Sequence, residues 1–247
     1  MHLPSRLAQV LAVAALPLAL TACSTASSGA SGSSGSSGSD APAKTTKAQD
    51  ANAGLMTGSQ LKKALAPASF FPSGLTAVAD GAADSGGQFL APSGRSAAKP
   101  DCGKFENTSW IDVTGYKGGV SFAQSDYGNS DRTEEMVQEI DEFQGTTATA
   151  VMKEVRDAAT ACASFTDTEA HAKVRLAGSD TPGLGDEAYT ITLTSGSWEN
   201  GTTLVAARVG TSVVTVMSTA GSDNGATSGG KLASHVVTSL KEAAGAS

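Results

Sequence analysis

The chain has 247 residues, of which 40% are apolar, 17% charged and 5% aromatic, and its formal net charge is −7. Binding to a polyanion depends on clustered Lys and Arg, so this acidic composition argues against a nucleic-acid partner. Three cysteines and three histidines leave little material for a zinc site, and we expect no metal or other cofactor.

Residues 1–22 have the pattern of a bacterial lipoprotein signal peptide. Arg6 precedes an apolar run at 7–20, which is too short to form a stable membrane span. The run ends in Leu20-Thr21-Ala22-Cys23, the pattern of a lipobox, in which the cysteine sulfur receives a diacylglyceryl group before cleavage. Two acyl chains anchor a protein stably because each buried methylene contributes about 0.8 kcal/mol. We expect Cys23 to hold the protein at the outer face of the cytoplasmic membrane; an ordinary leader with a chance cysteine is the alternative.

Residues 23–54 are predicted to be a flexible tether between this anchor and a domain at 55–247. Positions 24–54 contain no Val, Ile, Leu, Met or aromatic residue, and Gly and Ser repeat through 32–39. Such a segment cannot bury apolar surface and stays flexible. About thirty residues of this kind span roughly 30 Å, which would keep the domain away from the membrane.

The two remaining cysteines are Cys102 and Cys162, an even number in an oxidising compartment, which predicts a disulfide. Closing a loop of about sixty residues would stabilise the domain by roughly 4 kcal/mol on the chain-entropy model. Two free thiols or a redox pair are the alternatives, but the sequence has no C-x-x-C spacing to favour a redox pair.

The domain is expected to begin with a short helix. Thr57 and Gln60 have the spacing of a capping box, and Met56 and Leu61 are placed to form a hydrophobic staple. Pro67 ends the helix, and the Gly-, Pro- and Ser-rich segment 68–104 is expected to be irregular.

Alternating apolar and polar residues predict strands at 110–114 and 120–123, joined by a turn at 117–119. A polar loop at 125–132 leads to a predicted strand at 136–143, whose acidic pattern also permits a helix.

The strongest helical pattern covers 148–162. Its apolar face is formed by Ala148, Val151, Met152, Val155, Ala159 and Cys162. Cys162 is therefore expected to point inward, which suits a buried structural disulfide.

The last third reads as a meander followed by a helix. Strands are expected at 172–176 and 189–193. A two-residue type II′ turn at Gly210-Thr211 would pair Val209 with Ser212, Ala207 with Val214, and Val205 with Val216. A final helix at 231–244 places Leu232, Val236 and Leu240 on one face and ends at Gly245. This order predicts a single α+β domain, an antiparallel sheet with helices packed on one face.

Motifs with catalytic or cofactor chemistry are weak throughout. Gly183-x-Gly185-x-x-Ala188 superficially fits a dinucleotide fingerprint, but it leads into a strand, which favours a turn. The spacing of Asp126, Asn129 and Asp131 does not fit a calcium loop. His171 and His235 lie far apart and are interpreted as solvated residues. The acids at Glu134, Glu135, Glu139, Asp141 and Glu142 are interpreted as a solvated face and not as a paired acid and base.

Four aromatic residues in polar or turn-rich segments are the candidate ligand surface: Trp110, Tyr116, Tyr127 and Trp198. The alternative for each is a packing role. Together these observations predict a lipid-anchored sensor or binding module without catalysis, whose partner is a small ligand or an envelope protein. A cell-envelope hydrolase with an unrecognised Ser or Asp site is the alternative.

Three segments resemble the PknH-type extracellular sensor domain: Ala159-Thr-Ala-Cys162, Pro182-Gly-Leu-Gly185-Asp186-Glu187-Ala188, and Val209-Gly210-Thr211-Ser212-Val213-Val214. The resemblance covers about 100–245. Domains of this type occur outside the membrane in actinobacterial receptor kinases and in envelope lipoproteins, and the resemblance implies disulfides and a cleft for a small ligand. The chain departs from the pattern in having cysteines for one bridge alone, and in lacking a Trp just before Cys162.

Overall fold

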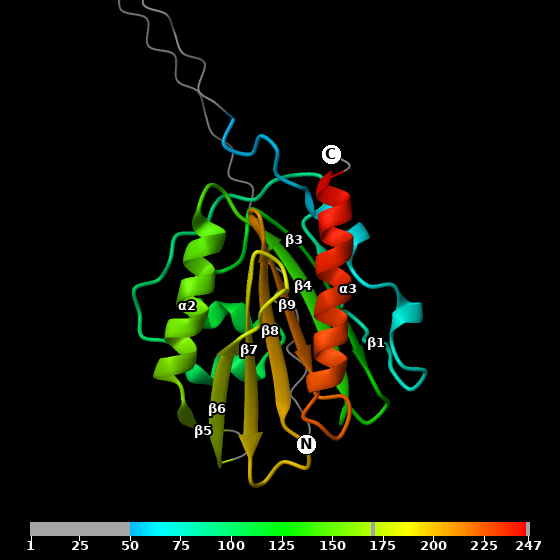
Figure 1. Cartoon of the computed structure of the whole chain (residues 1–247), viewed down its shortest axis with the longest axis vertical. Coiled ribbons are helices and arrows are strands. Elements are labelled where there is room, and N and C mark those ends of the chain that lie inside the picture. The colour runs from blue at the N-terminus through cyan, green and yellow to red at the C-terminus, as the bar shows by residue number, and fades with distance from the viewer. Residues whose placement is uncertain (1–49, 169–170, 246–247) are drawn as a thin grey trace, which may run out of the picture. The chain divides into compact units, whose positions relative to one another are not determined.

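The computed structural model describes residues 50–168 and 171–245 (Figure 1). The helices of this part are α1 (Gly58–Leu61), α2 (Thr147–Ala161) and α3 (Ala226–Gly245), with 3-10 helices η1 (Lys62–Ala64), η2 (Ala68–Phe70), η3 (Cys102–Glu106) and η4 (Trp110–Thr114). The strands are β1 (Thr76–Ala77), β2 (Ala83–Asp84), β3 (Ser121–Gly128), β4 (Glu135–Glu142), β5 (Ser164–Asp167), β6 (Ala172–Asp180), β7 (Glu187–Ser195), β8 (Thr202–Val209) and β9 (Ser212–Ser218).

The predicted signal peptide at 1–22, the lipidation site Cys23 and most of the tether lie outside the described residues. In the part that is described, no helix has the length and apolar character needed to cross a membrane.

The described strands form one antiparallel sheet in the order β1-β3-β4-β9-β8-β7-β6-β5, and β2 pairs separately with β3. Strands β5 to β9 follow one another as a meander. The last of them, β9, lies beside β4, which precedes α2 in the chain. This arrangement confirms the expected α+β class and places β4 and β9 in the middle of the sheet.

The β8–β9 hairpin has the predicted register: Val209 lies opposite Ser212, Ala207 opposite Val214, and Val205 opposite Val216. Gly210 takes a φ of 60°, whereas Thr211 stays at negative φ. A type II′ turn needs this combination, which glycine adopts without steric cost.

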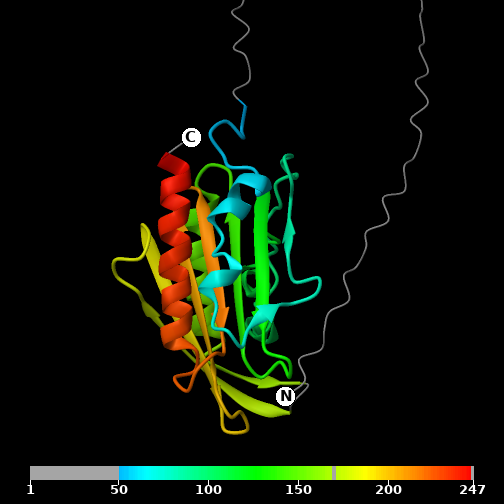
Figure 2. The same ribbon diagram turned by 90° about the vertical axis from the view of Figure 1, so that its right-hand side faces the viewer.

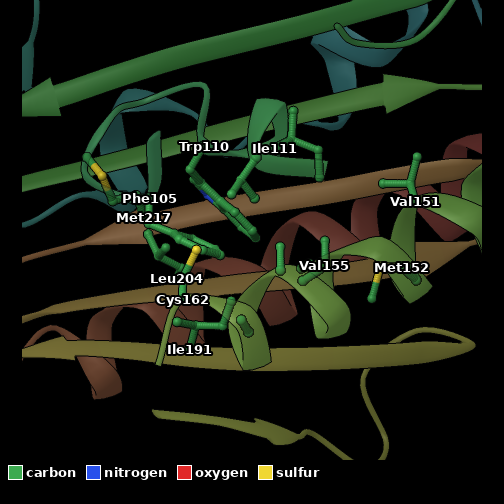
Figure 3. Close-up of a cluster of buried hydrophobic side chains, with 14 of the residues drawn as sticks. Phe105, Trp110, Ile111, Val151, Met152, Val155, Cys162, Ile191, Leu204 and Met217 are labelled. Carbon is green, nitrogen blue, oxygen red and sulfur yellow. The ribbon is translucent and has the colours of Figure 1, made fainter. Parts of the chain in front are cut away.

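Helices cover both faces of the sheet, which differs from the expected one-sided packing. On β8, Leu204 and Ala206 belong to a core with α2 and η4, whereas Val205 and Ala207 belong to a second core with α3 and α1. In Figure 3 the α2 side chains and Trp110 pack onto the strands, and α3 runs behind those strands. Figure 2 shows α3 along its own side of the sheet.

The reason for this two-sided packing lies in the middle strands. Every residue of β4 and of β9 is buried, including the consecutive apolar residues Val213 and Val214. Successive side chains of a strand point to opposite faces, so an unbroken buried run needs a cover on each side. A fully buried Val or Leu side chain contributes about 1.5–3 kcal/mol, and α2 and α3 supply these contacts on opposite faces.

Both long helices are confirmed, with one change of boundary. The predicted α2 face is buried, and Cys162 directly after the helix has no exposed surface. Helix α3 begins at Ala226, five residues before the predicted start. Asp223 sets the earlier start because its carboxylate accepts the backbone N–H of Thr227 at 2.9 Å, as an N-terminal cap does.

The segment 110–114 is the 3-10 helix η4 and not the predicted strand. Trp110 and Ile111 are adjacent in the sequence and both buried, which an alternating strand with one solvated face does not allow. Gly115 ends η4 at a φ of 84°, and its N–H donates to the Asp112 carbonyl. A five-residue alternation is too short to separate a strand from this packed turn.

The predicted strand at 136–143 is confirmed as β4. The predicted loop at 125–132 is wrong in its first half, because β3 continues to Gly128 and pairs with β4 over eight residues. At the N-terminal end of the domain, α1 has the expected capping box between Thr57 and Gln60.

Candidate functional site

A groove of about 490 Å³ opens on strands β5, β6 and β7 at one side of the sheet. We call it the cationic groove. Its lining residues are Ala163, Ser164, Lys173, Arg175, Leu176, Ala177, Thr192 and Thr194. This volume falls within the range of small-molecule sites.

The alternation of β6 creates the floor of the groove. Val174 and Leu176 face the core under α2, so the residues that alternate with them, Lys173 and Arg175, point to the opposite face and are exposed. That opposite face is the one that α3 covers farther along the sheet, on β8 and β9. Because α3 does not extend over β5 to β7, the cations stay accessible.

The two cations of the groove have no ion-pair partner in the part of the chain that the structure describes. Neither Lys173 nor Arg175 forms an ion pair within residues 50–168 and 171–245, whereas the four other arginines described there all do. Arg208, for example, donates to Asp186 at 3.0 Å and to Glu187 at 2.8 Å. The absence of a partner for Arg175 therefore sets it apart from the other described arginines.

The four predicted aromatic residues do not form one surface. Trp110 is 1% exposed and belongs to the core under α2, and Tyr116 and Trp198 pack against that same core. Tyr127 lies on the other side of the sheet, where its ring stacks on Phe71 with 3.7 Å between centroids. The candidate ligand surface is therefore divided, because Trp110, Tyr116 and Trp198 belong to the core under α2 and Tyr127 belongs to the core on the other face.

The acids of β4 are buried, which corrects the expected solvated face. Glu139 is 7% exposed and Asp141 is 1% exposed, and Glu135 and Glu142 are buried as well; Glu134, just before the strand, is partly exposed. The expectation failed because β4 is a central strand covered on both sides. Polar and charged residues at such positions need internal partners.

Those partners are mostly hydroxyls, backbone amides and other acids. Glu142 accepts from Thr211 Oγ1 and Ser212 Oγ, and Asp141 accepts from the Gly119 N–H at 2.7 Å. Glu139 hydrogen-bonds to Asp141. Burial, together with the neighbouring acids, raises the pKa of Glu139 well above its usual value.

Three further carboxyls share this behaviour, and in one of them, Glu142, burial raises the pKa against the hydrogen bonds from Ser212 and Thr211. Burial raises the pKa of Asp141 to about 6, partly offset by the Gly119 N–H and the Glu139 hydrogen bond. Burial and the charge of Glu135 raise the pKa of Asp126 to about 7, against the opposing effect of Arg132. Glu139, Asp141 and Asp126 lie on the α2 face of β3 and β4, whereas Glu142 lies on the other face beside Ser212, and none of the four lines the cationic groove. Within the described residues no group of His, Cys, Asp and Glu could hold a metal ion.

The remaining sequence motifs have structural roles. Gly183 and Gly185 form the β6–β7 turn at positive φ, as expected. Asn129 caps a loop by accepting the Glu134 N–H and donating to Thr133. His235 packs against Phe70 with the rings tilted and 4.7 Å between their centroids, and His171 is an exposed turn residue before β6.

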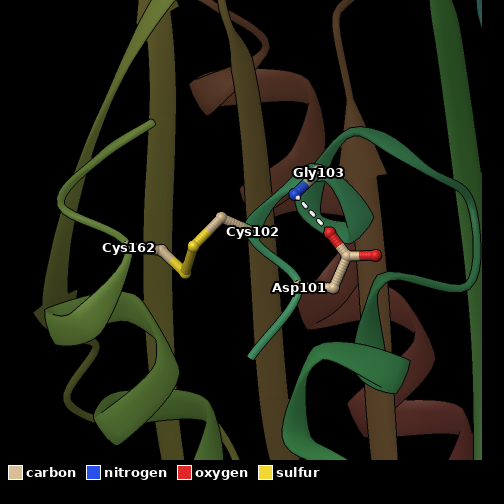
Figure 4. The surroundings of a disulfide bond; sticks show 4 residues. All are labelled: Asp101, Cys102, Gly103 and Cys162. Atoms are coloured by element: carbon tan, nitrogen blue, oxygen red, sulfur yellow. Dashed lines mark hydrogen bonds between the residues drawn. A yellow bond between two sulfur atoms is a disulfide. The ribbon is translucent and has the colours of Figure 1, made fainter. Parts of the chain in front are cut away.

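The predicted disulfide joins Cys102 at the start of η3 to Cys162 at the end of α2 (Figure 4). The two Cα atoms are 5.5 Å apart and the residues are separated by 60 positions. Asp101 caps η3 beside the bridge by accepting the Gly103 N–H at 3.3 Å. The bridge thus ties the segment before η4 to the helix that packs on it.

Sequence reasoning missed the cationic groove, although one signal was present. Lys173 and Arg175 alternate with Val174 and Leu176, which places two cations on one strand face. The threonines of β7 alternate in the same way with Ile191 and Leu193. What the pattern could not show is that β5, β6 and β7 lie side by side with these faces uncovered.

Comparison by sequence finds no matching family model and no matching characterised protein. Comparison by structure finds a solved structure described as the extracellular domain of PknH from Mycobacterium tuberculosis. The TM-score is 0.56 at 15% sequence identity, and the match covers 76% of this chain and 98% of that chain. The domain therefore has the fold of the PknH extracellular domain, which confirms the expected resemblance at the level of the fold.

Proposed function

We propose that this chain is a lipid-anchored binding module outside the cytoplasmic membrane, which captures a ligand without transforming it. The observation that carries the proposal is the fold shared with the extracellular domain of PknH, over 98% of that domain. That domain acts outside the membrane, and the likeness supports the same location and a sensing or binding role here.

Two independent features support the location. The sequence Leu20-Thr21-Ala22-Cys23 follows an apolar leader, as a lipobox does. The Cys102–Cys162 bridge suits an oxidising compartment, where disulfides persist. A diacylated Cys23 followed by the Gly- and Ser-rich tether would hold the domain near the membrane surface.

The chemistry of the cationic groove supports binding over catalysis. Nucleophilic catalysis needs a hydroxyl or thiol within hydrogen-bond reach of a base. In the described part of the chain, Ser164, Thr192 and Thr194 have no carboxylate or imidazole within that reach. The carboxyls with raised pKa values, Glu139, Asp141, Asp126 and Glu142, belong to β3 and β4, and none of them lines the groove on β5, β6 and β7.

The experiment combines metabolic labelling with protease treatment of intact spheroplasts. A fatty-acid analogue should label the wild type and the matched control Ser24→Ala, whereas Cys23→Ala should stay unlabelled. External protease should cut the tether and release a folded domain from wild-type spheroplasts. Label retained in Cys23→Ala would overturn the lipid anchor, and a domain protected from protease until lysis would overturn the location.

A further inference from the structure

We propose that the cationic groove binds a small ligand that carries a phosphate monoester, with the size of a phosphorylated sugar. This inference rests on the proposed binding function and names the ligand chemistry of the groove. The charge of the groove, its hydroxyl groups and its size each favour a ligand that carries a phosphate monoester.

The charge of the groove calls for an anion with more than one negative charge. Lys173 and Arg175 are two residues apart on β6, so both side chains lie on the same face and repel each other. No Asp or Glu lies on this face of β5, β6 or β7 in the described residues, although acids outnumber Lys and Arg by 24 to 17 in the whole chain. A phosphate monoester carries about −1.5 to −2 charges at pH 7 and matches the two cations.

Hydroxyl groups flank the cations in register. Arg175 lies opposite Ser164 on β5 and opposite Thr194 on β7. Directly opposed residues in an antiparallel pair have Cβ atoms about 4.5–5.5 Å apart, which lets one ligand contact all three side chains. The guanidinium group can bind two phosphate oxygens at once, and the hydroxyls can donate to a third oxygen or to a sugar hydroxyl.

The size and position of the groove fit a ligand larger than a bare ion. Its volume of about 490 Å³ exceeds what a single phosphate group needs. Thr192 lies beside Ala177 farther along the same face, so a polar wall continues beyond the cations. Both side chains of the cation pair are exposed, so the ligand can enter without movement of α3.

Phosphate groups outside a membrane come from soluble metabolites and from lipid headgroups. The diester of a phospholipid carries one negative charge and the monoester of a soluble ligand up to two. The pair Lys173 and Arg175 therefore favours the monoester. The following test distinguishes a soluble phosphate monoester from a phospholipid headgroup.

The test is calorimetric titration of the full mature protein, held by its anchor in nanodiscs of neutral phosphatidylcholine. Glucose 6-phosphate is the probe, and glucose is the uncharged comparison. We expect the phosphorylated probe to bind and glucose to show at least about tenfold weaker binding. Lys173→Gln combined with Arg175→Gln should weaken binding of the probe at least about tenfold. The control, Lys231→Gln combined with Lys241→Gln, removes two exposed cations of α3 that have no ion pair among the described residues, and it should bind as the wild type does.

A second arm tests the lipid source by flotation of the unlipidated Cys23→Ser chain with vesicles. Phosphatidylcholine vesicles with phosphatidylglycerol should recover no more wild type than vesicles without it. The proposal would be overturned if the wild type and the combined Lys173→Gln and Arg175→Gln variant bound glucose 6-phosphate equally well. Failure of the wild type to bind the probe, or groove-dependent flotation with phosphatidylglycerol, would also overturn it. None of these results changes the labelling and protease outcomes above, so the proposed location and anchor stand or fall separately.

Discussion

Glu139 and Asp141 lie two residues apart on β4, both buried, and their side chains hydrogen-bond to each other on the α2 face of the sheet. The other groups that face Glu139 are also acids, Asp126 and Asp112. Asp112 forms an ion pair with Lys104 at 3.6 Å, and Arg132 acts on Asp126 from the end of the strand. A folded protein therefore holds protons here that its unfolded chain releases.

This cluster of buried carboxyls makes the free energy of unfolding depend on pH. The pKa of Asp141 is about 6 and that of Asp126 about 7 in the folded protein, against 3.8 for an unperturbed Asp. Well below pH 3.8 these carboxyls are protonated in both states. Between pH 4 and 7 the unfolded chain ionises first, so the free energy of unfolding falls as pH rises. The slope is about 1.4 kcal/mol per pH unit for each extra proton held.

Glu139→Gln tests the origin of that slope. The amide cannot ionise, and it can still donate to Asp141, so unfolding by denaturant should show a smaller loss of stability from pH 4 to pH 8. Glu199→Gln, in the loop after β7, is the control and should keep the wild-type slope. An unchanged slope in Glu139→Gln would show that the buried cluster does not hold the extra proton.

The disulfide makes a second prediction. Cys102→Ser or Cys162→Ser should lower the free energy of unfolding by about 2–5 kcal/mol, because the bridge restricts the unfolded chain. Intact mass after alkylation without reductant should be the same as before alkylation for the native protein. Two added alkyl groups would contradict the bridge.

The turn glycines give a matched pair of substitutions. Both Gly183 and Gly185 have positive φ, but a Cβ on Gly185 would lie 2.4 Å from the Arg208 carbonyl oxygen, whereas one on Gly183 meets nothing within 4 Å. Gly183→Ala should cost about 1 kcal/mol from backbone conformation alone. Gly185→Ala should cost clearly more, measured by chemical denaturation. Equal losses would mean that the close approach to Arg208 is relieved by a small shift.

Because Trp110 is a core residue, its substitution should act on the stability of the domain. Trp110→Ala should destabilise the domain by about 3–5 kcal/mol, because the ring is fully buried between η4, α2 and the sheet. Lys173→Gln, on the exposed face of β6, should leave the melting temperature unchanged within a degree or so. A stable Trp110→Ala variant would contradict the core position of this ring.

Features that depend on local sequence could be predicted. The Gly210-Thr211 turn set the β8–β9 register, and the 3.6-residue period of α2 placed Cys162 inside the core. The pairing of Cys102 with Cys162 followed from the count of cysteines and the compartment. Each of these inferences needed only neighbouring residues or a simple inventory.

Features that depend on which helix covers which face could not be predicted in the same way. The burial of Glu139 follows from the cover on both faces of β4, by α3 on one side and by the core of η4 and α2 on the other, and α2 and α3 are more than sixty residues apart in the chain. Arg175 is exposed because α3 packs on β8 and β9 and does not extend over β6. The apolar run around Val213 and Val214 was the available sign that helices cover both faces.

The central claim is that the domain binds a ligand and does not transform it. The most direct measurement is native mass spectrometry of the protein released from its own membranes, followed by mass analysis of the dissociated ligand over time. We predict a bound small molecule of constant mass, which the combined Lys173→Gln and Arg175→Gln variant lacks and which stays unchanged on incubation with the wild type. Conversion of that molecule into a product, abolished by substitution of a single Ser or Asp, would contradict the claim.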